Sequence, residues 1–243
     1  MTEFIMELAG KKFGATTIFE YTHEYCSEFL CQGKADSSVS IEANDLSIER
    51  EKSAREDAVE GIPTGNHSDA YLETIALQRK VVEEFFTYDT LLFHGSVVAV
   101  DGQAYLFTAK SGTGKSTHTR LWRDMLGEKA VMVNDDKPFL EIKPEGVTAW
   151  GSPWMGKHRL GANIGVPLRA ICILERGEEN SIHPISAREA LPMLMQQSQR
   201  PQKPQNLSKY LELIDKLTER VAFYRLRCNM TPEAAQVAYE AMK

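Results

Sequence analysis

The residues with the clearest chemical potential lie in the stretch TAKSGTGKST, residues 108–117. Gly112 and Gly114 can adopt positive φ and bring backbone N–H groups close to anionic oxygens. Lys115 offers a positive charge to the β- and γ-phosphates of a nucleotide, and the Ser116 hydroxyl is placed to bind Mg²⁺. The pattern predicts a loop that binds ATP and Mg²⁺ through Ser111, Gly112, Thr113, Gly114, Lys115, Ser116 and Thr117. A chance turn rich in glycine and serine is the alternative.

The first position of this loop departs from the usual pattern, because Ala109 stands where a glycine is common. A methyl group is tolerated there if the residue ends the preceding strand with a negative φ. We therefore expect the loop to keep its phosphate-binding function.

A second group with chemical potential is the pair Asp135 and Asp136, which follows the apolar segment AVMVN. Consecutive side chains on extended backbone point in opposite directions, so the two carboxylates are expected to have different roles. One can bind Mg²⁺ and the other can take the proton of an incoming hydroxyl, and the sequence does not say which does which. The alternative is an N-D-D-K turn whose aspartates cap backbone groups.

The elements around these residues read as strand, loop, helix and strand. Two apolar strands meet at Asp101-Gly102, a dipeptide typical of tight hairpins, and the second strand, AYLFT, leads into the loop. An amphipathic helix follows and can end at Gly127. A right-handed crossover would make AYLFT and AVMVN parallel in one sheet, so that the aspartates emerge beside Lys115 and Ser116.

The whole chain alternates predicted strands and helices, which indicates the α/β class. The pieces FIMEL, TTIFEY and SVSIEA predict short strands in the first sixty residues, and Ser68 or Asp69 can begin a helix that reaches residue 86. We expect one domain over residues 1–243, with a β-rich N-terminal elaboration over 1–66 and a nucleotide-binding core over 91–174.

Composition and charge exclude several classes of function. A net charge of −6 argues against nucleic acid as a partner, because duplex binding depends on Lys and Arg. No apolar run is long enough for a membrane span or a secretory signal, and we expect a cytoplasmic protein. The cysteines lack zinc-site spacing and are expected to be reduced thiols: Cys26, Cys31, Cys172 and Cys228.

The stretch HGSVVAVDGQAYLFTAKSGTGKST, followed by VNDD, resembles the HPr kinase/phosphorylase family. That family shares its nucleotide fold with ATP-dependent phosphoenolpyruvate carboxykinase. His94-Gly95 is similar to the family's His-Gly before the loop, residues 111–116 to its S-G-x-G-K-S core, and Asp135-Asp136 to its paired aspartates. The resemblance implies a mixed sheet with a P-loop strand–loop–helix. The chain's ending also resembles small kinases encoded beside modified-peptide pathways.

The resemblance implies transfer of the γ-phosphate of ATP to a serine-type hydroxyl, with one aspartate as general base and His94 near the reacting phosphate. A buried structural histidine is the alternative for His94. Thr117 stands where the HPr kinases usually carry glutamate, so the substrate can differ from HPr. Lys157 and Arg159 lie in a glycine-punctuated segment that either closes over the phosphates or is a solvated surface loop.

Three functions follow from these observations. The leading one is an ATP- and Mg²⁺-dependent kinase that acts on a Ser/Thr-type hydroxyl of a peptide, a small protein or a metabolite, in a chain that can form a homo-oligomer. The second is a nucleotide-gated module that binds a partner peptide without phosphotransfer. A decarboxylating carboxykinase is remote, because the chain is too short for that enzyme's substrate domain.

Overall fold

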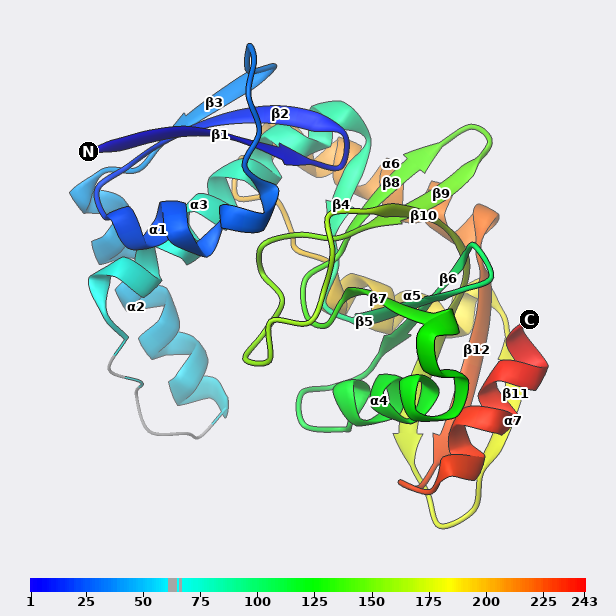
Figure 1. Ribbon diagram of the computed structural model, residues 1–243. Helices are drawn as coiled ribbons and strands as arrows, with labels where there is room; N and C mark the ends of the chain where they lie inside the picture. Colours follow the sequence, from blue (N-terminus) through cyan, green and yellow to red (C-terminus); the bar gives the residue numbers. More distant parts are fainter. Residues whose placement is uncertain (61–64, 66) are drawn as a thin grey trace. The chain divides into compact units, whose positions relative to one another are not determined.

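The computed structural model describes residues 1–60, 65 and 67–243, and the chain divides into two compact units, Met1–Glu84 and Phe85–Lys243 (Figure 1). The predicted end of the N-terminal elaboration, residue 66, lies outside the described residues. The division falls before the last residue of α3 (Asp69–Phe85), because this helix is bonded to the first unit. Lys80 Nζ donates to the Ser40 carbonyl over 2.8 Å, and Arg79 pairs with Glu49.

The first unit contains a three-stranded sheet. β1 (Thr2–Leu8) and β2 (Lys11–Thr17) pair antiparallel, and β3 (Ser37–Ser40) pairs parallel with β2. Both residues of the β1–β2 turn have positive φ, 48° at Ala9 and 71° at Gly10, so the chain reverses at once. The strand predicted for TTIFEY, residues 16–21, is wrong. β2 already begins at Lys11 and ends at Thr17, and the rest of TTIFEY leads into helix α1 (Glu20–Tyr25).

Three α-helices complete the first unit: α1, α2 (Ala43–Glu60) and α3, with the short 3-10 helix η1 (Ser27–Phe29). Ser68 caps α3 as predicted, because its hydroxyl accepts the Tyr71 N–H over 3.2 Å. The fully buried Glu73 of α3 accepts the N–H groups of Ile18 and Phe19 and the hydroxyl of Thr22. This carboxylate fixes the start of α1, because it satisfies backbone donors that the helix leaves unpaired.

The second unit is built on a curled, mixed sheet of nine strands. The strand order is β4-β8-β9-β10-β6-β5-β7, and β12 pairs with β10 and β11. The strands are β4 (Thr90–Leu92), β5 (Ser96–Val100), β6 (Gln103–Thr108), β7 (Ala130–Asn134), β8 (Phe139–Lys143), β9 (Gly146–Trp150), β10 (Gly165–Arg176), β11 (Ser181–Ile185) and β12 (Ala222–Cys228). The α/β class is thus as predicted.

The directions of these strands decide where the loops gather. β10 runs parallel to both β6 and β12, whereas β5 pairs antiparallel with both β6 and β7. β6 and β7 therefore point the same way, as predicted, but β5 lies between them. The carboxyl ends of β6, β7, β10 and β12 all reach the same edge of the sheet.

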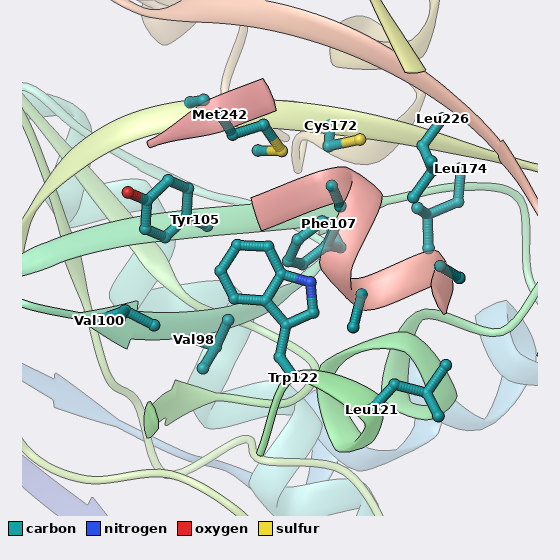
Figure 2. Close-up of a cluster of buried hydrophobic side chains, with 14 of the residues drawn as sticks. Val98, Val100, Tyr105, Phe107, Leu121, Trp122, Cys172, Leu174, Leu226 and Met242 are labelled. Carbon is teal, nitrogen blue, oxygen red and sulfur yellow. The ribbon is translucent and has the colours of Figure 1, made fainter. Parts of the chain in front are cut away.

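One face of this sheet is covered by α4 (Lys115–Leu126) and α7 (Pro232–Met242). Trp122 of α4 is fully buried and packs between Tyr105 and Phe107, with ring centroids 5.1 and 5.2 Å away (Figure 2). Met242 of α7 lies over the same cluster. The stripe of apolar residues on α4 thereby fixes this helix, and with it the loop that precedes it, on the sheet.

The remaining helices are α5 (Ala187–Gln197) and α6 (Leu207–Arg220), with the 3-10 helices η2 (Phe86–Tyr88), η3 (Gly127–Lys129) and η4 (Pro204–Asn206). α5 begins with a complete capping box formed by Ser186 and Glu189, as the sequence predicts. α6 packs against α5 and contacts β4, β8 and β9. Within the described residues, no helix has the length and apolar character needed to cross a bilayer.

Candidate active site

The glycine loop, defined as residues 109–114, joins β6 to α4. Gly112 has a φ of 73° and Gly114 a φ of 121°, values that disfavour any residue with a Cβ. The loop closes on itself through a bond from the Thr113 N–H to the Lys110 carbonyl, 3.3 Å. Arg176, at the end of β10, donates to the Gly112 carbonyl over 2.6 Å. The predicted strand–loop–helix arrangement is present, and its loop is held from the neighbouring strand.

Ala109 directly follows β6 and lies inside the protein core. Its side chain is completely buried, in the same cluster as Phe107 and Trp122. The non-glycine residues with positive φ in the described chain are Ala9, Asp89, Asp101 and Arg159. Ala109 is not one of them, so its methyl group fits the backbone without strain, as the sequence analysis expects.

Asp135 follows β7 and is buried against the first turn of α4. Its Oδ1 accepts the hydroxyl of Ser96 over 2.6 Å, and the side chain of Ser116 also hydrogen-bonds to it. Ser96 in turn bonds to the Thr119 hydroxyl over 2.9 Å. Burial raises the pKa of Asp135, and the bonds from Ser96 and Ser116 oppose that rise. This carboxylate therefore lies beside the loop-side hydroxyl that the sequence assigns to Mg²⁺.

Asp136 has a different environment. Its side chain is 33% exposed, and its Oδ1 lies 3.3 Å from His94 Nε2 and 3.6 Å from Lys137 Nζ. The two carboxylates thus face different partners, as expected for consecutive residues after a strand. Asp135 is buried beside hydroxyl groups, and Asp136 is partly exposed.

Lys115 lies between these groups and the glycine loop. Its Nζ lies 3.3 Å from the Ala109 carbonyl. Burial lowers the pKa of Lys115, while the negative charges of Asp136 and Asp135 act in the opposite direction. The predicted residues Lys115, Ser116, Asp135 and Asp136 therefore form one electrostatically coupled group.

His94 precedes β5 at the same edge. Burial lowers the pKa of His94 to about 3, and the nearby charges of Lys137 and Lys115 add to that effect. The imidazole is therefore neutral at pH 7, so the 3.3 Å contact between its Nε2 and the Asp136 Oδ1 is not an ion pair. The structure thus brings His94 to the predicted site.

Asn134 holds the turn that contains the aspartates, and it was not among the residues predicted from the sequence. Its Oδ1 accepts the N–H groups of Asp136 and Lys137, at 2.9 and 2.7 Å. Its Nδ2 donates to the carbonyl and the hydroxyl of Ser152. The turn expected as an alternative is therefore present, but Asn134 caps it and not an aspartate. An asparagine at the end of a strand is the signal that would have predicted this Asx turn.

The segment 151–164, which contains Lys157 and Arg159, is anchored beside Asp136. The Ala162 N–H bonds to the Val133 carbonyl over 3.2 Å, and the Ser152 hydroxyl bonds to the Lys137 carbonyl over 2.6 Å. Lys157 is exposed, whereas the Arg159 guanidinium donates to the Pro153 carbonyl over 2.9 Å. The segment therefore borders the site, and both its closure over the phosphates and the role of its cations in catalysis stay predictions.

Comparisons with known proteins add a family to this geometry. The family model described as "SynChlorMet cassette protein ScmC" matches residues 59–236, which is more than half of the chain. The chain belongs to the ScmC family. Curated proteins yield no match to this ScmC-family chain. A solved structure, the "Hpr(Ser) kinase/phosphatase from Coxiella burnetii", is distantly similar, with 10% sequence identity and a TM-score of 0.37 over 62% of this chain and 95% of that one.

The donor atoms at the site of this ScmC-family member suit Mg²⁺. Oxygen ligands are those that Mg²⁺ prefers, and Ser116, Asp135 and Asp136 supply a hydroxyl and two carboxylates. No group of three or more His, Cys, Asp or Glu side chains that could hold a metal occurs in the described part of the chain.

Proposed function

We propose that this ScmC-family protein is a kinase that transfers the γ-phosphate of ATP to a Ser/Thr-type hydroxyl of a peptide, a small protein or a metabolite. The observation that supports it is the meeting of Lys115, Ser116, Asp135 and Asp136 at one edge of the sheet, beside the glycine loop. Such a group combines the cation, the metal ligands and the base that phosphoryl transfer requires.

The glycine loop and the first turn of α4 would bind the phosphates. Gly112 and Gly114 allow backbone N–H groups to approach phosphate oxygens, and the N-terminus of α4 adds unpaired donors and a favourable dipole. Lys115 would leave the Ala109 carbonyl and pair with the β- and γ-phosphates, because a phosphate is a stronger acceptor than a neutral carbonyl.

Asp135 and Ser116 would hold Mg²⁺. Asp135 is buried and carries the raised pKa of a carboxylate that lacks solvation, and a nearby divalent cation would stabilise its charged form. When bound, Mg²⁺ supplies neutralisation of the charge on the phosphate oxygens. The hydrogen bond between Ser116 and Asp135 keeps both oxygen donors near one position.

Asp136 would be the general base. Its partial exposure leaves room for an acceptor hydroxyl, and the neutral His94 ring lies 3.3 Å from one of its carboxylate oxygens. Asp136 takes the proton of the acceptor hydroxyl while the oxygen of that hydroxyl forms a bond to the γ-phosphorus. The bond between the γ-phosphorus and the β,γ-bridging oxygen breaks, and ADP leaves with that oxygen.

Labelled phosphate transfer tests this proposal directly. The protein is incubated with Mg²⁺ and [γ-³²P]ATP against a serine- and threonine-containing peptide library, and products are identified by intact mass. We expect Asp136→Asn to lower transfer by about 10²–10⁴-fold while the affinity for Mg-ATP stays within about threefold. Asp124→Asn, at an exposed position on α4, is the matched control and should keep wild-type transfer.

Two other results would contradict the proposal. Equal transfer by Asp136→Asn and the wild type would exclude this aspartate as the base. Tight ATP-dependent capture of a peptide without any phosphorylated product would indicate the alternative function, a nucleotide-gated binding module.

A further inference from the structure

Two cavities flank the glycine loop. The α4-side cavity has a volume of about 560 Å³ and is lined by Gly112, Thr117, His118, Leu121, Cys228 and Met230, among others. The α5-side cavity has a volume of about 570 Å³ and is lined on its other side by residues of α5 and β12. Thr113, Leu174 and Arg176 border both, so the loop and the end of β10 divide them.

The chemical character of the two cavities differs. The α5-side cavity is lined by five charged side chains, Lys110, Glu175, Arg176, Glu189 and Arg225. Glu175 and Arg225 form an ion pair there. In the α4-side cavity the charged lining residues are Glu175 and Arg176, and the rest of the wall is apolar or neutral. A planar, uncharged heterocycle is better accommodated by the second environment.

We propose that the α4-side cavity binds the base and ribose of the nucleotide whose phosphates occupy the glycine loop. This inference rests on the proposed function. It adds where the nucleoside part of ATP binds and which residues surround it. The cavity includes Thr117, directly after the Ser116 that would bind Mg²⁺, so a phosphate chain along the loop can enter it. Its volume lies within the range of pockets that bind small molecules, about 300–1,000 Å³.

His118 contributes a neutral ring to the wall of this cavity. It is 3% exposed, lines the cavity, and accepts the Trp122 Nε1–H at its Nε2 over 3.1 Å. A neutral ring that accepts at Nε2 carries its proton on Nδ1. This Nδ1 has no hydrogen-bond partner among the described residues, and such buried donors are uncommon. This nitrogen is itself buried, so the ring borders the cavity as part of its uncharged wall.

The test compares a nucleotide with its phosphate chain alone, Mg-ATP against Mg-tripolyphosphate, by isothermal titration calorimetry. Cys228→Phe places a ring in the α4-side cavity and should weaken ATP binding at least tenfold, with tripolyphosphate affinity within twofold of wild type. Gln196→Phe is the matched control, because Gln196 is exposed and lines the α5-side cavity. It should leave ATP affinity unchanged.

The outcomes separate the inference from the function it rests on. Unchanged ATP affinity in Cys228→Phe, or a loss confined to Gln196→Phe, would overturn the placement of the nucleoside while phosphate binding stands. A wild-type protein that binds neither ATP nor tripolyphosphate would overturn the proposed function, and the placement with it.

A second measurement uses the unmodified protein, in case Cys228→Phe does not fold. Cys228 is partly exposed at the cavity wall, so its alkylation by iodoacetamide can be followed by peptide mass. Mg-ATP should slow that reaction at least tenfold and Mg-tripolyphosphate should not, whereas Cys31 should react at the same rate with either ligand. Equal alkylation of Cys228 with and without ATP would contradict the proposal.

Discussion

Glu73 in the first unit and Asp135 in the second are both buried carboxylates, and their surroundings differ in kind. Glu73 is fully buried and accepts two backbone N–H groups and the Thr22 hydroxyl. Asp135 accepts hydroxyls from Ser96 and Ser116, but burial still raises its pKa. Glu73 thus completes a helix start, whereas Asp135 has a charge that its own protein leaves poorly solvated.

The difference shows which buried carboxylates point to function. A carboxylate bonded to backbone donors stabilises the fold and has little left to offer a ligand. A carboxylate that is enclosed by hydroxyls, near a lysine and a glycine-containing loop, is stabilised further only by a cation or a proton. Burial of a carboxylate therefore does not by itself indicate a functional site. The groups that donate hydrogen bonds to the carboxylate are the better indication.

The largest effect expected from this comparison is on Glu73. Glu73→Ala leaves the N–H groups of Ile18 and Phe19 without their acceptor and should destabilise the first unit by about 4 kcal/mol. All three tryptophans lie in the second unit, so urea unfolding of the first is followed by far-UV circular dichroism. Glu24→Ala, at an exposed position on α1, should cost less than about 0.5 kcal/mol. A loss below 1 kcal/mol for Glu73→Ala would refute its structural role.

The second effect is acid sensitivity of the second unit. Burial lowers the pKa of His118 from 6.5 to about 4. Between these values the unfolded chain binds a proton that the folded chain does not, so stability is present above pH 6.5 and is lost as the pH falls. From pH 7 to pH 4 this group alone should remove about 3 kcal/mol.

The measurement is urea unfolding followed by tryptophan emission at pH 7 and pH 4. His118→Gln keeps an acceptor for the Trp122 N–H and does not titrate, so the variant should lose less stability than the wild type over that range. Parallel losses in both proteins would show that His118 is not the responsible group.

The third effect concerns Ala109, which is a core residue inside the candidate binding loop. Ala109→Gly removes a buried methyl group and adds backbone freedom, and should destabilise the second unit by about 1–2 kcal/mol. The affinity for Mg-ATP should not rise, because the position does not use positive φ. An increase in affinity would mean that the usual glycine has a functional advantage here.

The smallest effect returns to Asp135. Its raised pKa means that the charged form costs stability at pH values above its folded pKa. Asp135→Asn should therefore stabilise the second unit at pH 7, with the gain shrinking as the pH falls toward the pKa. A clear loss of stability at pH 7 would place Asp135 in the same structural class as Glu73.

The elements around the loop were predictable because their signals are local. Asp101 and Gly102 have φ values of 50° and 76°, as their dipeptide indicates, and Ser186 and Glu189 form the expected capping box. The β1–β2 turn was not predictable in the same way. Ala9 adopts a positive φ that its residue type disfavours, so the chain turns there and β2 begins earlier than the sequence predicts.

The reactive residues of the candidate site were predictable from the sequence, but the residues that hydrogen-bond to them were not. Lys115, Ser116 and the aspartates stand out by type and spacing, because few other roles require that combination. Ser96, Thr119 and Asn134 are common residues whose bonds to the site depend on which strands are neighbours. Strand order is a long-range property, and the insertion of β5 between β6 and β7 has no local signal.

That inserted strand has a consequence for how the site can change. With β5 between them, β6 and β7 are two strand spacings apart, about 9–10 Å. This width is set by main-chain pairing, which no single side-chain replacement alters. Residues in the surrounding segments can therefore change while the separation between the glycine loop and the aspartates stays constant.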